Sequence, residues 1–233
     1  MIIIERNIST KEKQNVIDLR RLLGKNYDEL PEMQTIYNRA MENIIEKLES
    51  IDHNFYKLYN RNSIHHIESR LKTPESIFNK LKRKGYEPSI KKAKEVLTDI
   101  AGIRVICHFK DDIYTVADML CSQKDITLMC TRDYIKNPKP NGYRSLHIIV
   151  STPVVIKDKI HITPVEIQIR SIAMDFWASL EHQIRYKNAD CPAESLFERL
   201  KSCADRIAQI DEEMQSINKE IELFGISKKS ESL

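Results

Sequence analysis

The stretch VEIQIR, residues 165–170, sets the fold expectation because its apolar and polar residues alternate strictly. Alternation with a period of two puts the three apolar residues on one face of a strand and Glu166, Gln168 and Arg170 on the other. The apolar face predicts burial against a core. The polar face, taken alone, is more typical of a solvated sheet surface than of a ligand site.

Further short runs rich in β-branched residues predict more strands of the same sheet. They are IRVICHF at 103–109, ITLMC at 126–130 and LHIIVS at 146–151. The segment KNPKPNG, residues 136–142, combines prolines, asparagines and a glycine, which excludes regular structure there. The middle of the chain is therefore expected to form one sheet with a basic loop before one of its strands.

Helical patterns flank this strand-rich middle. In residues 30–51 apolar residues recur three or four apart, which predicts an amphipathic helix, and Gly24 is expected to end a shorter helix before it. Residues 173–187 also have helical spacing, and residues 190–192 are expected to break the chain. The predicted fold class is α/β, of the α+β type, with a mixed sheet and flanking N- and C-terminal helices.

The predicted organisation is a single domain over residues 1–233. We expect N-terminal helices in 1–60, the catalytic core in 62–188 and a C-terminal helix in 193–225. The last helix has apolar residues at alternating steps of four and three, the a and d positions of a heptad: Leu196, Leu200, Cys203, Ile207, Ile210, Met214, Ile217 and Ile221. Such a seam packs on another helix, either of its own domain or of a second copy.

Composition limits the class of protein. The net charge of +3 is too small to imply bulk nucleic-acid binding. The five cysteines are odd in number and lack metal-ligand spacing, so reduced thiols are expected. The first ten residues lack the apolar core of a signal peptide, and no apolar run is long enough to span a membrane. We therefore expect a cytoplasmic protein with no membrane partner.

The segment RLKTPESIFNKLKRK, residues 70–84, is the strongest candidate for an anion site. Thr73 is suited to N-cap a helix and Pro74 to occupy its first turn, where free N–H groups attract anions. Ser76 and Lys80 follow on one helix face, opposite an apolar face. This pattern indicates phosphate binding; the alternative is a solvated basic helix.

Two further clusters lie near expected strand and loop ends. In DIAGIR, residues 99–104, Asp99 and Arg104 flank two small residues, so that a ligand could approach the backbone closely. A strand with an edge salt bridge is the alternative. In NGYRSLH, residues 141–147, Tyr143 follows the basic loop and could stack on a base or cap the edge of the core.

The combination of these segments favours chemistry over a solvated surface. It brings basic phosphate binders, two separate carboxylates and an aromatic side chain into one sequence, as phosphoryl transfer requires. No Walker A, GxGxxG or protein-kinase motif is present to suggest another class of nucleotide enzyme.

The ordered motifs RLKTPESIFNKL, DIAGIRVIC, YIKNPKPNGYRSLH and VEIQIRSIAMDFWASLEH resemble the synthetase domain of the RelA/SpoT family. They are most similar to the single-domain small alarmone synthetases of the RelP type, over residues 64–187. The resemblance implies a nucleotidyltransferase-like fold and a GTP pyrophosphokinase. Such an enzyme transfers the β,γ-pyrophosphate of ATP to the 3'-OH of GDP or GTP, which gives ppGpp or pppGpp and AMP. The alternatives are a single-stranded RNA-binding protein and a catalytically inactive nucleotide-binding relative.

For ATP, the resemblance implies that the adenine lies between Arg70 and Arg104. The phosphates of ATP are expected to contact Lys72, Ser76 and Lys80.

For catalysis, the resemblance assigns Mg²⁺ to Asp99 and Glu166. Glu166 is also expected to take the proton from the attacking 3'-OH.

For GDP or GTP, the resemblance implies that guanine stacks on Tyr143. The 5'-phosphates of this acceptor are expected to contact Arg132, Lys139 and His147. Further acceptor contacts are expected from Gln168, Asp175 and Glu181.

Two other expectations follow from the family. The adjacent His65 and His66 lack the wider His/Asp pattern of the family's hydrolase, so we interpret them as the approach to a helix and expect synthesis without breakdown. HHIES, residues 65–69, lacks the groups expected for activation by pppGpp, so strong activation is not expected. Small synthetases assemble through their flanking helices, so a homotetramer is expected, with nucleic acid an unlikely partner.

Overall fold

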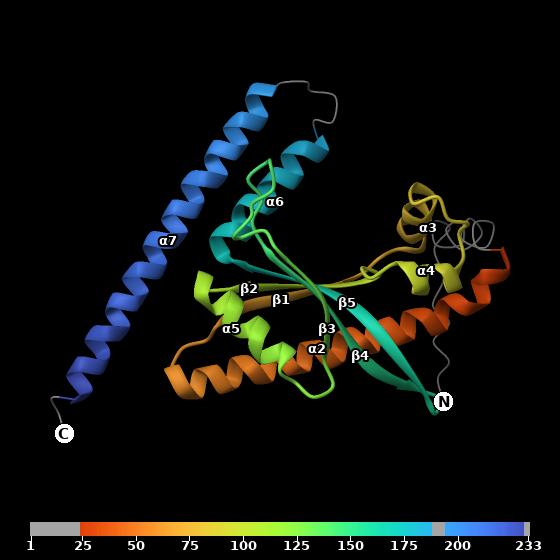
Figure 1. Ribbon diagram of the computed structural model, residues 1–233, viewed down its shortest axis with the longest axis horizontal. Coiled ribbons are helices and arrows are strands. Elements are labelled where there is room, and N and C mark those ends of the chain that lie inside the picture. The colour runs from red at the N-terminus through yellow and green to blue at the C-terminus, as the bar shows by residue number, and fades with distance from the viewer. Residues whose placement is uncertain (1–23, 188–193, 231–233) are drawn as a thin grey trace, which may run out of the picture.

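A five-stranded mixed sheet organises the computed structural model, which describes residues 24–187 and 194–230 (Figure 1). The strand order is β1-β2-β5-β4-β3. The strands are β1 (Ile64–Leu71), β2 (Ala101–Cys107), β3 (Thr127–Asp133), β4 (Leu146–Ile156) and β5 (Lys159–Ser171). β2 and β5 run parallel, and the other neighbouring pairs are antiparallel. The predicted mixed sheet with flanking helices is confirmed, and so are the strands expected within β2 to β5.

The edge strand β1 was not expected from the sequence. It contains His65 and His66, which were interpreted as the approach to a helix; the strand does lead toward the helix that begins at Pro74, but its extended form was not predicted. Most of its side chains are exposed, and its register is irregular between Ile64 and His66, so no clean alternation marks it as a strand. Pairing with β2, a tertiary interaction, makes this segment extended.

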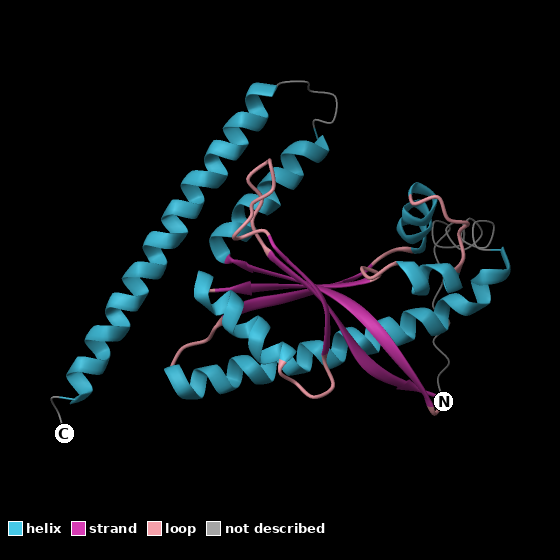
Figure 2. Cartoon of the chain, viewed as in Figure 1, coloured by secondary structure: helices cyan, strands magenta, loops and turns pink. Residues whose placement is uncertain are grey.

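One face of the sheet is covered by α2 (Leu30–Tyr59) and α5 (Lys110–Cys121) (Figures 1 and 2). The apolar side chains predicted to form the stripe of α2 are all buried: Met33, Tyr37, Ala40, Ile44, Leu48 and Ile51. They meet the apolar face of β5, whose Val165, Ile167 and Ile169 are fully buried as predicted. The opposite face of the sheet is left to carry polar groups.

Before α2, a 3₁₀ helix η1 (Gly24–Glu29) begins at Gly24. The shorter helix expected before Gly24 lies outside the described residues.

At the other end of β1, the predicted basic helix forms α3 (Pro74–Arg83), followed by α4 (Ile90–Val96). Pro74 stands in the first turn, and Ile77 and Leu81 are fully buried. The burial of the apolar face fixes which side of α3 turns outward, so Lys80 is directed toward the polar side of the sheet.

The chain leaves β5 directly into α6 (Ile172–Lys187), and α7 (Glu194–Ser230) packs on α6 (Figure 1). Both helices were predicted, whereas the expected break at 190–192 lies outside the described residues. Along the heptad seam of α7, only Leu200 and Ile207 pack on the cluster around Trp177. Other seam residues are exposed: Leu196, Cys203, Ile210, Met214, Ile217 and Ile221.

Polar contacts complete the attachment of α7 to the core. Ser171 donates a hydrogen bond to Asp211 at 2.7 Å, and Arg144 donates one to Asp205 at 3.0 Å. The exposed part of the seam is therefore left uncovered by the domain that α7 is attached to.

Two further expectations concerned the state of the cysteines and membrane-spanning helices. Cys107, Cys121, Cys130 and Cys203 are free thiols. Within residues 24–187 and 194–230, no helix has both the length and the apolar content to cross a membrane.

Candidate functional site

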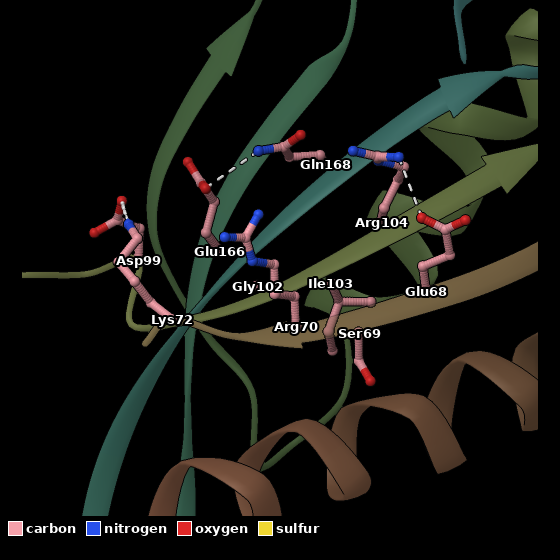
Figure 3. A pocket seen from close by; sticks show the side chains of 10 residues that line it. All are labelled: Glu68, Ser69, Arg70, Lys72, Asp99, Gly102, Ile103, Arg104, Glu166 and Gln168. Carbon is pink, nitrogen blue, oxygen red and sulfur yellow. Dashed lines mark hydrogen bonds and ion pairs between the residues drawn. The ribbon is translucent and has the colours of Figure 1, made fainter. Parts of the chain in front are cut away.

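A cavity of about 810 Å³ opens on the polar side of β1, β2 and β5 (Figure 3). Six of the predicted site residues line it: Arg70, Lys72, Asp99, Arg104, Glu166 and Gln168. Glu68, Ser69, Gly102 and Ile103 complete the lining. The cavity thus brings together cationic and anionic side chains that lie as much as 98 residues apart in the sequence, from Glu68 to Glu166.

Strand register explains how these side chains meet. In one row across the sheet, Arg70 on β1 is opposite Gly102 on β2, which is opposite Glu166 on β5. Gly102, which has no side chain, adds nothing between Arg70 and Glu166, both of which line the cavity (Figure 3). The small residue noted in the sequence therefore stands at the floor of the cavity.

A second row of side chains crosses all five strands, two residues along each strand from the first row. It runs through Glu68, Arg104, Gln168, His147 and Arg132. Arg104 donates a hydrogen bond to Glu68 at 3.1 Å, so the edge salt bridge considered from the sequence exists within the cavity wall. This row connects residues expected to bind ATP with residues expected to bind the acceptor.

Asp99, in the turn before β2, holds two lysines on one carboxylate oxygen. Lys72 donates to Oδ2 at 2.6 Å, and Lys80 contacts the same oxygen. Burial alone would raise the pKa of Asp99, but the two ammonium groups outweigh burial and lower it. Its other oxygen, Oδ1, is buried and has no hydrogen-bond partner among the described residues. Asp99 is therefore ionised and keeps one oxygen available for a cation.

The start of α3 is capped as predicted. The cap engages backbone N–H groups that were expected to bind an anion, so the positive charge of the site comes from side chains instead. The side chain of Thr73 accepts a hydrogen bond from the backbone N–H of Ser76 at 3.3 Å, and its carbonyl accepts one from Ile77. These amides are engaged within the helix. Positive charge beside the cavity comes from the side chains of Lys72 and Lys80, while the hydroxyl of Ser76 contacts that of Thr73 at 3.0 Å.

Glu166 lies partly buried on β5 with its carboxylate in the cavity. Interaction with His147, whose Nδ1 lies 3.7 Å from Oε1 of Glu166, lowers the pKa of Glu166. Burial raises this pKa, and a hydrogen bond from Gln168 at 3.2 Å lowers it further. The nearby charge of Asp99 raises the same pKa slightly. Glu166 is therefore ionised at neutral pH, so it can accept a proton or a cation.

Tyr143 lies beside the cavity, within a second cluster of predicted residues. Its hydroxyl is 2.8 Å from Nε2 of His147 and accepts a hydrogen bond from Arg170 at 2.6 Å. The ammonium of Lys139 lies 4.8 Å from the centre of its ring, and Tyr134 makes an edge contact with it. Tyr143 is half-buried and also packs on the cluster around Trp177, as the core-edge role considered from the sequence requires; stacking on a base stays a prediction.

The other residues that were expected to contact the acceptor nucleotide lie on β3 and α6. Asp175 accepts a hydrogen bond from Arg170 at 3.0 Å and lies 3.7 Å from Arg104. Arg132 is exposed on the edge strand β3, opposite His147. Glu181, further along α6, accepts a hydrogen bond from Asn141 at 3.2 Å, so it holds the basic loop and does not line the cavity.

Three residues of the site carried no assigned role from the sequence. Glu68 lines the cavity, and its position two residues before Arg70 on a strand could have indicated this once β1 was recognised. Tyr134 contacts the rings of Tyr143 and His147, with no sequence pattern to mark it. Arg170 shares the polar face of β5 with Glu166, which the alternation already showed.

The donor set suits a hard divalent cation. Asp99 and Glu166 present carboxylate oxygens in one cavity, and Mg²⁺ is commonly held by one or two carboxylates together with the phosphates of the substrate. The described residues contain no group of three or more His, Cys, Asp or Glu that could hold a metal by protein ligands alone. A cation at this place would complete its coordination with ligands from outside the protein, such as water or phosphate oxygens.

Comparison with known proteins gives a consistent result. Residues 69–190 match the family model described as the region found in RelA/SpoT proteins. The GTP pyrophosphokinase YwaC of Bacillus subtilis is 45% identical over 188 residues, which cover 80% of this chain and 89% of that protein.

Solved structures of similar sequence share the fold. Small alarmone synthetase 2 of Bacillus subtilis is 42% identical, with a TM-score of 0.72 over 80% of this chain and 97% of that chain. Small alarmone synthetase 1 of the same organism, bound to its product pppGpp, is 36% identical, with a TM-score of 0.74 over 83% and 98% of the two chains. The same synthetase bound to AMPCPP gives a TM-score of 0.69 at 32% identity, over 83% and 98% of the two chains.

Proposed function

The chain belongs to the RelA/SpoT family and is a GTP pyrophosphokinase that makes (p)ppGpp, and from this premise we propose which residues carry the reaction. The β,γ-pyrophosphate of ATP passes to the 3'-OH of GDP or GTP. The 3'-oxygen forms a bond to the β-phosphorus, the bond from that phosphorus to the α,β-bridging oxygen breaks, and AMP leaves. The observation that carries the assignment is the pair of ionised carboxylates, Asp99 and Glu166, in one cavity with Arg70, Lys72 and Arg104.

ATP is proposed to occupy the β1–β2 side of the cavity. Arg70 and Arg104 project from neighbouring strands on the same face, so their guanidinium planes can pack on the two sides of an adenine. Lys72 and Lys80 are proposed to release Asp99 and turn to the phosphates when ATP binds, with Ser76 donating from the start of α3. This exchange keeps each ammonium group paired with an anion in both states.

Mg²⁺ is proposed to bind Asp99 through its buried, unpaired Oδ1 and Glu166 through its carboxylate. When bound, the cation would neutralise charge on the transferring phosphates. Glu166 is also proposed to take the proton of the 3'-OH, for which its lowered pKa keeps it in the required ionised form.

GDP or GTP is proposed to bind over the β5–β4 side, where guanine stacks on Tyr143. Lys139, His147 and Arg132 would meet its 5'-phosphates, since they surround Tyr143 or lie in the adjacent sheet row. Gln168 and Asp175 would contact the acceptor from β5 and α6. Glu181 is proposed to act through Asn141 on the loop that carries Tyr143.

Assembly and location are proposed on other observations. The exposed seam residues of α7 form a continuous apolar row that a second copy could cover, which supports a homotetramer. The free thiols and the nucleotide substrates support a cytoplasmic location.

One assay tests the reaction. The protein is incubated with Mg²⁺, ATP and either GDP or GTP, and the nucleotides are separated by ion exchange. We expect equal amounts of AMP and a guanosine nucleotide that carries two more phosphates. If no AMP forms while nucleotide or single-stranded RNA still binds, the inactive or the RNA-binding alternative replaces this function.

A further inference from the structure

Arg170 is buried at the end of β5, where the sheet continues into α6. Its guanidinium donates to Asp175 at 3.0 Å, to the side-chain oxygen of Gln168 at 3.0 Å and to the hydroxyl of Tyr143 at 2.6 Å. It also lies 5.0 Å from the centre of the Tyr143 ring. One buried cation thus contacts three residues that are proposed to bind the acceptor nucleotide.

The contact with Tyr143 favours one direction of a hydrogen-bond chain. A guanidinium can only donate, so the hydroxyl oxygen of Tyr143 accepts from Arg170, and its single hydrogen stays free to donate to Nε2 of His147, 2.8 Å away. Nε2 then acts as the acceptor, which leaves the hydrogen of a neutral His147 on Nδ1. That nitrogen faces Oε1 of Glu166 at 3.7 Å.

A second branch from Arg170 reaches the same carboxylate. Gln168 receives a hydrogen bond from Arg170 on its oxygen, which turns its amide nitrogen outward. That nitrogen donates to Oε2 of Glu166 at 3.2 Å. Both oxygens of the proposed base are therefore approached by groups whose orientation depends on Arg170.

We propose that Arg170 is the positioning residue of the acceptor side, which holds Tyr143 for the guanine and orients His147 and Gln168 toward Glu166. The proposal rests on the proposed function, since it names what Arg170 does in that reaction. It distinguishes Arg170 from a structural arginine such as Arg61, which donates to Asp112, Glu222 and the backbone oxygen of Asn62, none of which lines the cavity. Arg170 divides its donors among three polar partners of the site.

The main test compares Arg170→Gln with Arg61→Gln as the matched control, because both changes remove a guanidinium that pairs with a carboxylate. Steady-state kinetics are measured with ATP and GDP varied separately, and thermal unfolding is followed for each protein. For Arg170→Gln we expect kcat/KM for GDP to fall about 10- to 100-fold, since hydrogen bonds to a buried charge are lost, while the KM for ATP stays within threefold. Arg61→Gln should lower the melting temperature without this selective loss.

Tyr143→Phe and Arg170→Lys keep the proposal testable if Arg170→Gln unfolds. Tyr143→Phe retains the ring and removes only the hydroxyl between Arg170 and His147, so it should also lower kcat/KM for GDP selectively. The double variant Tyr143→Phe with Arg170→Lys should lose no more than Arg170→Lys alone, because both changes break one chain. Losses that multiply, or a KM for ATP that rises as much as the KM for GDP, would overturn the proposal.

Failure of the proposed function gives a different result. In that case the wild-type protein releases no AMP in the same assay. Calorimetric titration of GDP into the wild-type protein and these variants then tests Arg170 directly, and equal GDP affinity in all of them would overturn its positioning role.

Discussion

The ammonium group of Lys80 on α3 donates a hydrogen bond to Oδ2 of Asp99, the carboxylate that precedes β2, and forms an ion pair with it. This contact gives Lys80 two effects on the site. It brings positive charge beside the cavity and, together with Lys72, keeps Asp99 ionised against the effect of burial. The last turn of α3 is joined to the proposed cation ligand in this way.

Lys80→Ala should therefore impair ATP use through both effects. We expect kcat/KM for ATP to fall by about one to two orders of magnitude, the range of one lost hydrogen bond to a charged group, with the affinity for GDP nearly unchanged. Stability should change little, because the buried face of α3 formed by Ile77 and Leu81 remains intact. The measurement is steady-state kinetics with each nucleotide varied in turn.

Lys82→Ala is the matched control, since Lys82 is an exposed lysine on the same helix and is not among the residues that line the cavity. Kinetics of Lys80→Ala indistinguishable from those of Lys82→Ala would remove Lys80 from the ATP site.

Glu166→Gln should separate binding from turnover. The amide retains the shape of the side chain and an oxygen that can accept from Gln168, so the fold should persist. It cannot take a proton and binds a cation poorly, so we expect kcat to fall by about 10²- to 10⁴-fold while both nucleotides still bind. Single-turnover kinetics and calorimetric binding check this, and turnover within threefold of wild type would exclude Glu166 as the base.

The sequence predicted the part of the fold whose pattern is local. Strict alternation in residues 165–170 identified β5 and its two faces, and apolar spacing identified α2. β1 was missed because its extended form depends on pairing with β2, which no local pattern records. The helix α5 was not predicted, although its buried Ile113, Val116, Ala117 and Leu120 recur with helical spacing.

For the site, motifs predicted which residues gather but not how they bond to one another. Asp99 and Lys80 are 19 residues apart, and only the fold shows that they share one hydrogen bond. The role of Arg170 likewise depends on a partner from the loop before β4, Tyr143, and on one from α6, Asp175. Side chains that act through long-range hydrogen bonds leave no signal in spacing.

The exposed seam of α7 predicts how the chain assembles. Ile210 is 62% exposed on the seam of α7, so Ile210→Glu should leave the fold intact and weaken association between copies. Light scattering after gel filtration should show wild type near four times the chain mass of 27.3 kDa and the variant at a lower mass. Ser216→Glu places the same charge on an exposed position off the seam and should not change the mass. An unchanged mass for Ile210→Glu would locate the interface elsewhere.

The raised pKa of Asp211 on α7 leads to a prediction of how the free energy of unfolding depends on pH. Burial raises the pKa of this carboxyl, and the nearby charge of Glu212 adds to the rise, whereas the hydrogen bond from Ser171 and the charge of Lys110 oppose it. The pKa is therefore higher in the folded protein than the value of about 3.9 expected for an unfolded chain. Between these two values the folded protein binds the extra proton, so stability falls as the pH rises through this interval and stays lower above it.

Asp211→Asn removes this loss because an amide does not ionise, and its oxygen can still accept the hydrogen bond from Ser171. At pH 8 we expect the variant to melt about 2 to 4 °C above wild type for each kcal/mol of unfolding free energy that it gains. Near pH 3.5 we expect little difference, because the side chain at position 211 is then largely uncharged in both proteins. Asp205→Asn is the control on the same helix, since its carboxylate is half-exposed and paired with Arg144, and its removal should bring no gain. A lower melting temperature for Asp211→Asn at pH 8 would mean that ionised Asp211 stabilises the attachment of α7, contrary to the direction of its pKa shift.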